Sequence, residues 1–573
     1  MESAMLWRNF MKRHKRTIYW VSILVSVLLV SWLYNTTVAG SDDLYYKIDK
    51  GLFNLKEVFE TLSRNYVDDL DPEGVSKAAI QGMVRELDPY TVFFEDPGSQ
   101  RLGMITRGKY GGLGMEIVKQ NGRITVIAPM EDTPAKRAGI LPGDVITRID
   151  GEPTDDMTLE EASRKLRGKV GTQVTIEIER PGLDEPIEMT LTREEIVIKD
   201  VTYADFLEPG TVLLRLSGFS DKAARELKDA IHRLKAQREI ERVILDLRGN
   251  PGGLLTSAVE VANIFLSPGQ LVVSTRGAHE KENKFYTKEP ALLPHQPLVV
   301  LINQWSASAS EIVAGAIQDL DRGVLVGTQT FGKGLVQKVY PIDKINQSYL
   351  KITTAKYYTP SGRSIQKEDY KKNKDIFVDL SDSVEYDDHI NYYTRNGRVV
   401  HGGGGIHPDV VVENEKMDRF LAALTSRGYF FRFSVEYLAQ RPQLKQQSPF
   451  EVTDEMIDAF LTFLDKEGFD YELDGEEELE KFLEIARENN YNDDIQDLVQ
   501  VAIQKLEVEK RHLYQKDRDK IRRYLEAEFA EKLGGSRARI EAMLTYDRQV
   551  KKALEVLHNL STYQEILAVN KKN

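Results

Sequence analysis

Ser308 lies where a strongly apolar segment gives way to a helical pattern, within the stretch Asn303 to Glu311 (NQWSASASE). The segment before it, Leu298 to Ile302, is typical of a buried strand, and Ile312 to Leu320 is predicted to be helical. A serine at such a turn is exposed at the positive end of a helix, which favours a developing alkoxide. Ordinary helix capping would produce the same pattern, so this serine alone does not indicate an enzyme.

Lys333 stands between two glycines in the segment Gly327 to Gln337 (GTQTFGKGLVQ). A lysine can act as a general base only if its pKa falls from about 10.4 to ~7–8. Burial without a carboxylate partner can lower the pKa that far. The flanking glycines would let the backbone pack closely around the side chain. A solvated loop charge is the ordinary explanation of this lysine taken alone.

A glycine-rich turn, Asp246 to Gly253 (DLRGNPGG), follows another buried-type strand and precedes a helix. Such a turn presents backbone N–H groups where a negative charge can be held. Neither a Walker lysine nor a GxGxxG spacing accompanies it, which disfavours a phosphate-binding loop. A tight turn without a ligand stays open as an alternative.

A second glycine-rich motif, Tyr110 to Gly114 (YGGLG), immediately precedes a strand. Its amides could converge on an anion, and the strand edge could accept an extended peptide as an extra strand. Turn signals follow at Thr133 to Ile140, Leu141 to Ile146 and Ile149 to Gly151. These segments closely resemble the PDZ domains of bacterial proteases. The resemblance implies that a substrate's terminal carboxylate binds the loop formed by Gly111, Gly112, Leu113 and Gly114.

Taken together, the motifs closely resemble the C-terminal processing peptidases, also called tail-specific proteases, from about Phe53 to Val411. The resemblance implies that Ser308 is the nucleophile, Lys333 the general base, and Gln337 the residue that supports the lysine. It also implies a polypeptide substrate with a free C-terminus and no metal or organic cofactor.

The same resemblance implies an oxyanion hole formed by the amides of Ala309 and of Gly253 or Gly252. Trp305 departs from the family pattern, because many relatives have glycine there, and it puts the local fit of the substrate in doubt.

Three alternatives compete with this prediction. A histidine-based triad would need a base, and His407 is the nearest candidate, although it is better explained as a structural turn residue. A non-catalytic PDZ scaffold with a degenerate hydrolase domain is disfavoured by the intact Ser308, Lys333 and Gln337. A serine hydrolase acting on another substrate class is disfavoured by the PDZ domain. Metal-ligand spacing such as HExxH is absent from the sequence.

The composition is that of ordinary globular domains, with 573 residues, 41% apolar and 29% charged. The net charge of −13 provides no electrostatic footprint for nucleic acid. The absence of cysteine excludes a cysteine nucleophile, thiolate metal sites, disulfides and a cysteine-linked lipid anchor.

The N-terminus predicts a membrane segment. An uncharged stretch runs from Thr17 to Gly40, and Ile18 to Tyr34 is strongly apolar. Five basic residues precede it: Arg8, Lys12, Arg13, Lys15 and Arg16. Such a basic flank stays cytoplasmic, which places the rest of the chain across the membrane, facing the periplasm of a bacterial envelope. Thr37 to Ala39 is a weak cleavage site, so a retained anchor is favoured over a removed signal peptide.

The remaining pattern predicts the elements that position these residues. Alternating β-branched strands are expected over residues 103–195, and strands alternate with helices over residues 196–412, which indicates an α/β sheet. The expected core strands are Val212 to Leu216, Val243 to Leu247, Leu271 to Ser274 and Leu298 to Ile302, and the expected helices between them are Lys222 to Lys235 and Leu254 to Phe265.

We therefore expect a multidomain α+β protein. Its expected parts are an N-terminal membrane segment (1–40), a helical segment (41–100), a PDZ domain (101–195), a serine peptidase core (196–412) and a helical C-terminal extension (413–573). The resemblance implies that the core has the α/β fold shared by caseinolytic protease (ClpP) subunits and crotonases. The extension is charged and lacks catalytic motifs. It is either a solvated appendage or a site of self-association or adaptor binding. We expect that removing it leaves the active-site chemistry possible but weakens self-association or partner binding.

Overall fold

The computed structural model describes residues 44–95, 103–104, 106–343, 348–367, 391–446 and 450–568. Two compact units divide the chain, residues 1–86 and residues 87–573. In the first unit, residues 44–65 are helical, and α3 (Pro72–Arg85) begins at Asp71, whose carboxylate accepts hydrogen bonds from two amides of the first turn. The predicted membrane segment, within residues 1–40, lies outside the described residues. No helix among those described is long and apolar enough to cross a bilayer.

The second unit begins with the PDZ-like domain, a sheet in the order β3-β4-β5-β7-β8 with β6 paired to β5. Its elements are β3 (Met115–Gln120), β4 (Arg123–Pro129), α5 (Pro134–Arg137), β5 (Val145–Ile149), β6 (Glu152–Pro153), α6 (Leu159–Leu166), β7 (Gln173–Glu179) and β8 (Ile187–Thr192). A capping box starts α6, because the side chains of Thr158 and Glu161 each accept a hydrogen bond from the other's backbone amide. A separate pair, β2 (Lys109–Gly112) and β9 (Glu194–Val197), leads into and out of this domain.

The largest sheet has the strand order β10-β11-β12-β15-β16-β21. Its strands are β10 (Val201–Glu208), β11 (Thr211–Leu216), β12 (Arg242–Asp246), β15 (Leu298–Ile302), β16 (Val324–Gly327) and β21 (Val410–Val411). The first pair is antiparallel and every later pair is parallel. Asp246 pairs with Leu301, and Ile302 pairs with Gly327. The segments that follow β12, β15 and β16 therefore leave the sheet side by side at one edge.

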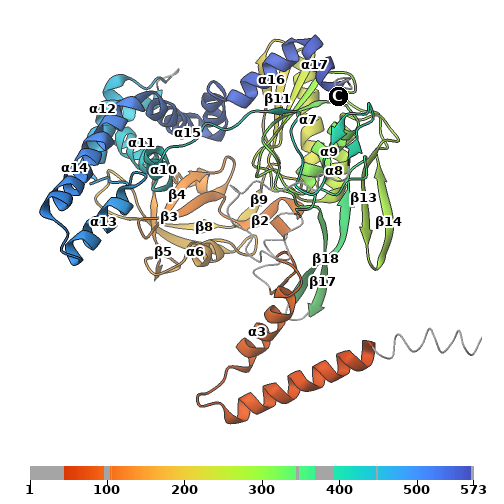
Figure 1. Cartoon of the computed structure of the whole chain (residues 1–573), viewed down its shortest axis with the longest axis horizontal. Helices are drawn as coiled ribbons and strands as arrows, with labels where there is room; N and C mark the ends of the chain where they lie inside the picture. The colour runs from red at the N-terminus through yellow and green to blue at the C-terminus, as the bar shows by residue number, and fades with distance from the viewer. Residues whose placement is uncertain are drawn as a thin grey trace, which may run out of the picture. The chain divides into compact units, whose positions relative to one another are not determined.

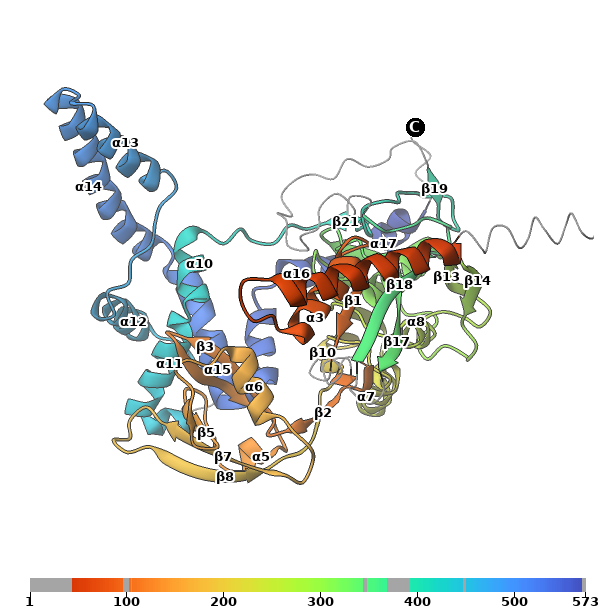
Figure 2. The ribbon, with the colours of Figure 1, turned by 90° about the horizontal axis from the view of Figure 1, so that it is seen from below.

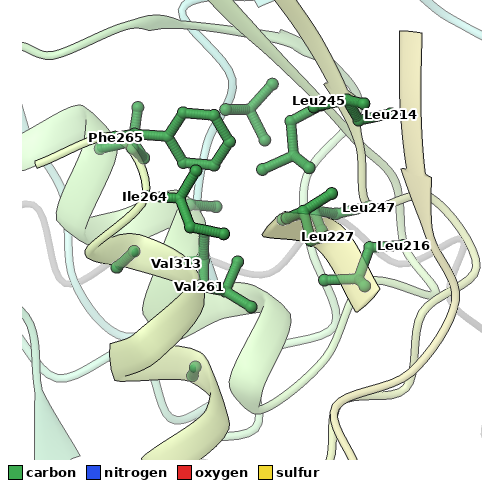
Figure 3. Close-up of a cluster of buried hydrophobic side chains, with 14 of the residues drawn as sticks. Leu214, Leu216, Leu227, Leu245, Leu247, Val261, Ile264, Phe265 and Val313 are labelled. Carbon is green, nitrogen blue, oxygen red and sulfur yellow. The ribbon is translucent and has the colours of Figure 1, made fainter. Parts of the chain in front are cut away.

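One face of this sheet is covered by α7 (Ala223–Gln237), α8 (Leu255–Ala262) and α9 (Ala309–Asp319). Every second strand residue, such as Leu214, Leu245 and Val300, points into this layer. Figure 3 shows Leu227 from α7 and Val261 from α8 directed into the same cluster. Because a parallel sheet needs both faces covered, the alternate strand residues require a second layer.

The second layer comes from the end of the chain. Leu213, Ile244, Val299 and Val326 pack with side chains of α16 (Arg548–His558) and α17 (Leu560–Leu567). The buried residues of the two helices are Val550, Ala553, Val556, Leu557 and Tyr563. The Tyr563 hydroxyl accepts a hydrogen bond of 3.1 Å from the Leu298 amide. In Figure 1, α16 and α17 lie beside β11, although more than 300 residues separate them in sequence.

A smaller sheet has the order β1-β18-β13-β14, with β17 also paired to β18. Its strands are β1 (Val92–Phe94), β13 (Leu271–Gly277), β14 (Glu280–Tyr286), β17 (Leu335–Asp343) and β18 (Ser348–Tyr358). A short pair, β19 (Tyr392–Tyr393) and β20 (Val399–Val400), stands apart. The hairpin of β17 and β18 matters for the site, because its first strand begins two residues after Lys333.

Between β21 and α16 the chain forms a helical domain with an aromatic core. Its elements are α10 (Arg419–Ser426), α11 (Tyr429–Gln440), η2 (Pro442–Gln446), α12 (Asp454–Lys466), α13 (Glu476–Glu488), α14 (Asp493–Lys516) and α15 (Arg518–Leu544). Phe420, Phe430, Phe433, Phe460 and Phe529 form its centre. The helices α13 and α14 lie side by side in both views (Figures 1 and 2). This domain interrupts a fold that α16 and α17 then complete.

Candidate active site

Ser308 occupies a strained position at the start of α9. Its backbone dihedrals are φ 56° and ψ −112°, outside the regions that ordinary L-residues favour. Such strain persists only where surrounding contacts enforce it, and it is concentrated at functional sites. Ser308 is the N-cap of α9, so it stands at the N-terminus of this helix, as the sequence predicted.

The three serines of this segment differ in their surroundings. Ser306 is fully buried, and its hydroxyl donates to the Leu247 carbonyl at 2.9 Å. Ser310 is also fully buried, and its hydroxyl donates to the Asn250 carbonyl at 2.9 Å. Ser308 is only partly buried. The two flanking serines therefore join the segment to the glycine-rich turn, and Ser308 is the one whose hydroxyl a substrate can reach.

Glu311 joins the segment that contains Ser308 to the loop that contains Lys333. Its carboxylate is fully buried and accepts from the Ser308 amide at 2.8 Å and from the Lys333 amide at 2.9 Å. It also accepts from the Gly332 amide at 2.7 Å and from the Thr330 hydroxyl at 2.6 Å. Burial raises the pKa of Glu311, while these four donors oppose the rise. A serine followed three residues later by glutamate is a capping-box pattern, and that signal could have identified Glu311 from the sequence.

Lys333 is contacted by neutral groups. Its ammonium lies 3.3 Å from the Gln337 side-chain oxygen and 5.0 Å from the centre of the Tyr90 ring. The Gln337 amide nitrogen donates in turn to the Tyr90 carbonyl at 3.0 Å. That second bond orients the amide so that its oxygen faces the lysine. The structure thus brings Lys333 and Gln337 together as the sequence indicated, and it adds Tyr90, which the sequence did not reveal.

Burial is the main cause of an unusual lysine pKa at this site. Burial and, to a smaller extent, the charge of Lys351 together lower the pKa of Lys333 to about 8. Glu311 and Asp88 act in the opposite direction without cancelling the effect. With a pKa near 8, about a tenth of the side chain is the free amine at pH 7. A free amine is what a general base must be.

Tyr357 touches both segments. Its side chain is 2% exposed, and its hydroxyl donates to the Lys333 carbonyl. The same hydroxyl is hydrogen-bonded to the Ser308 side chain. Burial raises the pKa of Tyr357, and the nearby Glu311 raises it further, so the phenol stays protonated at neutral pH. No motif in the sequence pointed to this residue.

The glycine-rich turn after β12 packs directly against the nucleophile. A Cβ atom on Gly252 would lie 2.6 Å from the Ala307 carbonyl oxygen and 2.8 Å from the Ser308 Cβ, so only glycine fits there. The Gly252 amide donates to the Asn250 side chain at 2.9 Å. Among the described residues, the amides of Gly253 and Ala309 are not engaged in any backbone hydrogen bond. Of the two glycines considered, Gly253 is therefore the one whose donor is available to a ligand.

The loop expected to bind a terminal carboxylate, Gly111 to Gly114, falls into two parts. Gly111 and Gly112 lie in β2, paired with β9, and the Gly111 carbonyl accepts from the Gly168 amide at 3.1 Å. Leu113 is buried, and Gly114 has a positive φ of 74°. The carbonyls of the latter two residues accept hydrogen bonds from Ala135 and Met130. Their N–H groups stand at the start of β3, which is an edge strand of its sheet.

His407 belongs to a structural network. Its carbonyl accepts from the Gln318 side chain at 2.9 Å, and Gln318 also accepts from the buried Arg363. Burial lowers the pKa of His407, and the nearby charges of His401 and Arg363 lower it further. In the described parts of the chain, no group of three His, Asp or Glu side chains could hold a metal ion.

Three family models match segments of this chain. Residues 125–180 match the model "PDZ domain", and residues 210–376 match "Peptidase family S41". Residues 420–557 match "Probable PDZ-protease, C-terminal helical domain".

Known proteins with similar sequences were also found. A "Carboxy-terminal-processing protease" of Bartonella bacilliformis is 38% identical over 61% of this chain and 80% of that relative. A "Probable CtpA-like serine protease" of Staphylococcus aureus is 34% identical over 65% of this chain and 75% of that relative. Among solved structures, the "Photosystem II D1 C-terminal processing protease" is 26% identical, covers 62% of this chain and 92% of that chain, and has a TM-score of 0.34.

Proposed function

We propose that Ser308 and Lys333 form the catalytic dyad of this chain, which belongs to the carboxy-terminal-processing proteases. This is a family of serine peptidases with a PDZ domain. Gln337 holds the lysine, and the amides of Gly253 and Ala309 form the oxyanion hole. The enzyme is an endopeptidase that cuts polypeptides near their free C-termini. No cofactor enters the reaction.

The observation that carries this proposal is the environment of Lys333. A buried lysine whose pKa falls to about 8 and whose hydrogen-bond partner is a neutral amide is unfavourable for stability but suited to proton transfer. Gln337 can accept from either the amine or the ammonium without the charge that would return the pKa to its ordinary range. A structural lysine would be expected to pair with a carboxylate or to reach solvent.

The reaction follows from this geometry. The neutral amine of Lys333 removes the hydroxyl proton of Ser308 as its oxygen attacks the scissile carbonyl. The resulting oxyanion is held by the amides of Gly253 and Ala309, at the positive end of α9. Lys333, now an ammonium, returns the proton to the leaving amine. Water then attacks the acyl-enzyme with the same lysine as base, which releases the second product and restores Ser308.

Glu311 acts as a positioning residue in this scheme. It accepts from the amides of both Ser308 and Lys333 and therefore fixes the distance between their backbones. Because the carboxylate is already bonded by four donors, it does not need the lysine ammonium as a partner. It can thus orient the lysine without neutralising the base.

A turnover assay tests the proposed function. A protein with a flexible C-terminal tail should be cleaved by the intact enzyme and not by the Ser308→Ala variant. Mass spectrometry of a trapped acyl-enzyme should place the adduct on Ser308. Equal cleavage by both proteins, or an adduct on another residue, would refute the assignment of the nucleophile.

The PDZ domain is proposed to select substrates by their terminal carboxylate. The amides at Leu113 and Gly114 are the donors, and the edge of β3 pairs with the peptide backbone. An amidated tail lacks the charge, and losing a charge-assisted hydrogen bond of roughly 1.5–3 kcal/mol should lower affinity about 10- to 150-fold.

Competition between the acid and amide forms of one substrate measures this effect. The acid form should be cleaved preferentially by the intact enzyme, and the preference should vanish when residues 103–195 are deleted. Equal rates for the two forms with the intact enzyme would rule out carboxylate capture.

The location of the enzyme is also a proposal. We expect the N-terminal segment, residues 1–40, to anchor the chain in the bacterial inner membrane with the remainder in the periplasm, because its five basic residues resist translocation. A reporter fused at Asp43 should be active only on the outer side of the membrane. Cytoplasmic reporter activity would contradict this topology.

A further inference from the structure

Arg248 stands at the start of the oxyanion turn, between β12 and the two glycines. Its side chain is 15% exposed. The carboxylate of Asp246 accepts from its Nε and from its Nη2, each at 2.8 Å, in a bidentate pair. The same carboxylate accepts from the Arg248 amide at 3.0 Å. The end of β12 thus holds one side of the guanidinium.

The start of α16 holds the other side. Asp547 accepts a hydrogen bond from Nη1 of Arg248 at 3.1 Å and forms an ion pair with Nη2 at 2.7 Å. Gln549 accepts from Nη1 at 2.9 Å. Burial alone would lower the pKa of Arg248, but the carboxylates of Asp246 and Asp547 outweigh it and raise the pKa. The guanidinium is therefore a permanent charge clamped between two segments about 300 residues apart in sequence.

Asp547 and Gln549, which hold Arg248 from α16, are themselves held by further contacts. Asp547 is the N-cap of α16 and accepts from the amides of Gln549 and Val550 at 2.9 Å and 3.0 Å. The helix that follows is packed into the second layer of the central sheet. Gln549 also donates to the Val412 carbonyl at 2.7 Å, just after β21. The chain therefore enters and leaves the helical domain, residues 419–544, beside the same arginine.

The turn on the far side of Arg248 is short and rich in glycine. Gly249 and Gly252 have positive φ angles of 71° and 96°, which only glycine adopts readily. The Asn303 side chain accepts from the Gly249 amide at 3.0 Å, and the Asn250 carbonyl accepts from the Ala307 amide at 3.0 Å. These bonds join the turn to the nucleophile segment. Arg248 joins it to α16, and Gly253 lies only five residues beyond.

We propose that Asp547 and Gln549 are positioning residues for the oxyanion hole, which they orient through Arg248. This inference rests on the proposed function, because it assigns the Gly253 amide to the transition state. It gives the end of the chain a role in catalysis as well as in the core.

The expected effect is selective for the transition state. An amide that drifts from the position of the oxyanion loses its interaction there and loses little in the substrate complex, so kcat falls while KM is preserved. Removing a whole oxyanion donor costs about 10²–10³ in kcat, so partial misplacement should cost ~10- to 100-fold.

Two variants of the full chain test this in a peptide-cleavage assay. Asp547→Asn removes the ion pair and keeps a good N-cap residue. Gln549→Met removes the hydrogen bonds of that side chain to Arg248, Val412 and Asn414 and keeps the ion pair and the size. Each should lower kcat ~10- to 100-fold with KM within about twofold. Each should also weaken a peptide aldehyde, whose adduct carries the tetrahedral oxygen, by the same factor as kcat.

Asp418→Asn is the matched control. Asp418 is also a helix N-cap, of α10, and its carboxylate pairs with Lys520 at 3.0 Å and not with Arg248. This variant should leave kcat and aldehyde affinity unchanged, as should circular dichroism in all three proteins.

Several outcomes would overturn the inference. These are unchanged kcat in both test variants, an equal loss in Asp418→Asn, or a loss of kcat with unchanged aldehyde affinity. Failure of both test variants to fold would also overturn it, because the contacts would then serve stability. The proposed function is judged separately in the same assay, since it fails only if the unmodified enzyme shows no more turnover than Ser308→Ala.

Discussion

Lys333→Arg is expected to lower turnover by at least ~10³-fold, as much as Lys333→Ala or Ser308→Ala. Arginine keeps the charge and the approximate length of the side chain, but its guanidinium cannot release a proton near neutral pH. Combining Ser308→Ala with Lys333→Ala should cost little more than either change alone, because the two side chains act as one unit. The measurement is kcat/KM on a tail-bearing protein at several pH values.

Lys338→Ala is a suitable control for these variants. Lys338 lies on β17, the strand that begins two residues after Lys333, but its side chain is about half exposed and pairs with Glu280. The control should retain full turnover. In the unmodified enzyme, kcat/KM should rise about tenfold per pH unit up to a plateau near pH 8, as the amine of Lys333 becomes free. Substantial turnover by Lys333→Arg would mean that another residue supplies the base.

Lys333→Met is expected to make the inactive protein more stable at neutral pH. The pKa of Lys333 is about 8 in the folded chain, against ~10.4 in an unfolded chain. Below pH 8 both states are protonated, so the whole cost of burying the ammonium falls on the folded state. A difference of about 2.4 pKa units corresponds to roughly 3 kcal/mol, which methionine, an apolar side chain of similar length, would remove.

The pH dependence gives this prediction its sign. Between pH 8 and ~10.4 the unfolded chain binds more protons than the folded chain, so the unmodified protein gains stability as the pH rises. The advantage of Lys333→Met should therefore be complete at pH 7 and should disappear near pH 10.4. Denaturant unfolding of both proteins at several pH values measures it. An advantage independent of pH would show that methionine acts by packing alone.

Much of the local structure was predictable from the sequence because local patterns determine it. The apolar run Leu298 to Ile302 forms β15 with those bounds, and the helix expected at Lys222 to Lys235 forms α7, Ala223–Gln237. The first is a short apolar run typical of a buried strand, and the second has helical periodicity. The helix α9 begins at Ala309, three residues before the expected start, because Ala309, Ser310 and Glu311 form its first turn.

The surroundings of the nucleophile could be predicted only in part. The order of parallel strands brings the segments after β12, β15 and β16 to one edge, which follows once the sheet is known. The contacts that tune Lys333 come from Tyr90 and from the hairpin of β17 and β18. Aromatic residues such as Tyr90 and Tyr357 occur throughout the chain, so neither carries a local signal of its position. Glu311 did have such a signal, in its spacing from Ser308.

The tertiary structure alone decided what the last helices do. An expectation drawn from sequence, that residues after about 413 could be removed without loss of the chemistry, changes once α16 and α17 are seen to bury Leu213, Ile244 and Val299. Their pattern is that of any amphipathic helix, which indicates that one face must be buried but not against what. The strand sequences did indicate that both faces of the sheet must be covered, because runs such as LVVLI are apolar on both faces. The chemistry proposed for Ser308 and Lys333 was thus predictable from residue type and spacing, whereas the second layer and its contact with Arg248 depend on long-range packing.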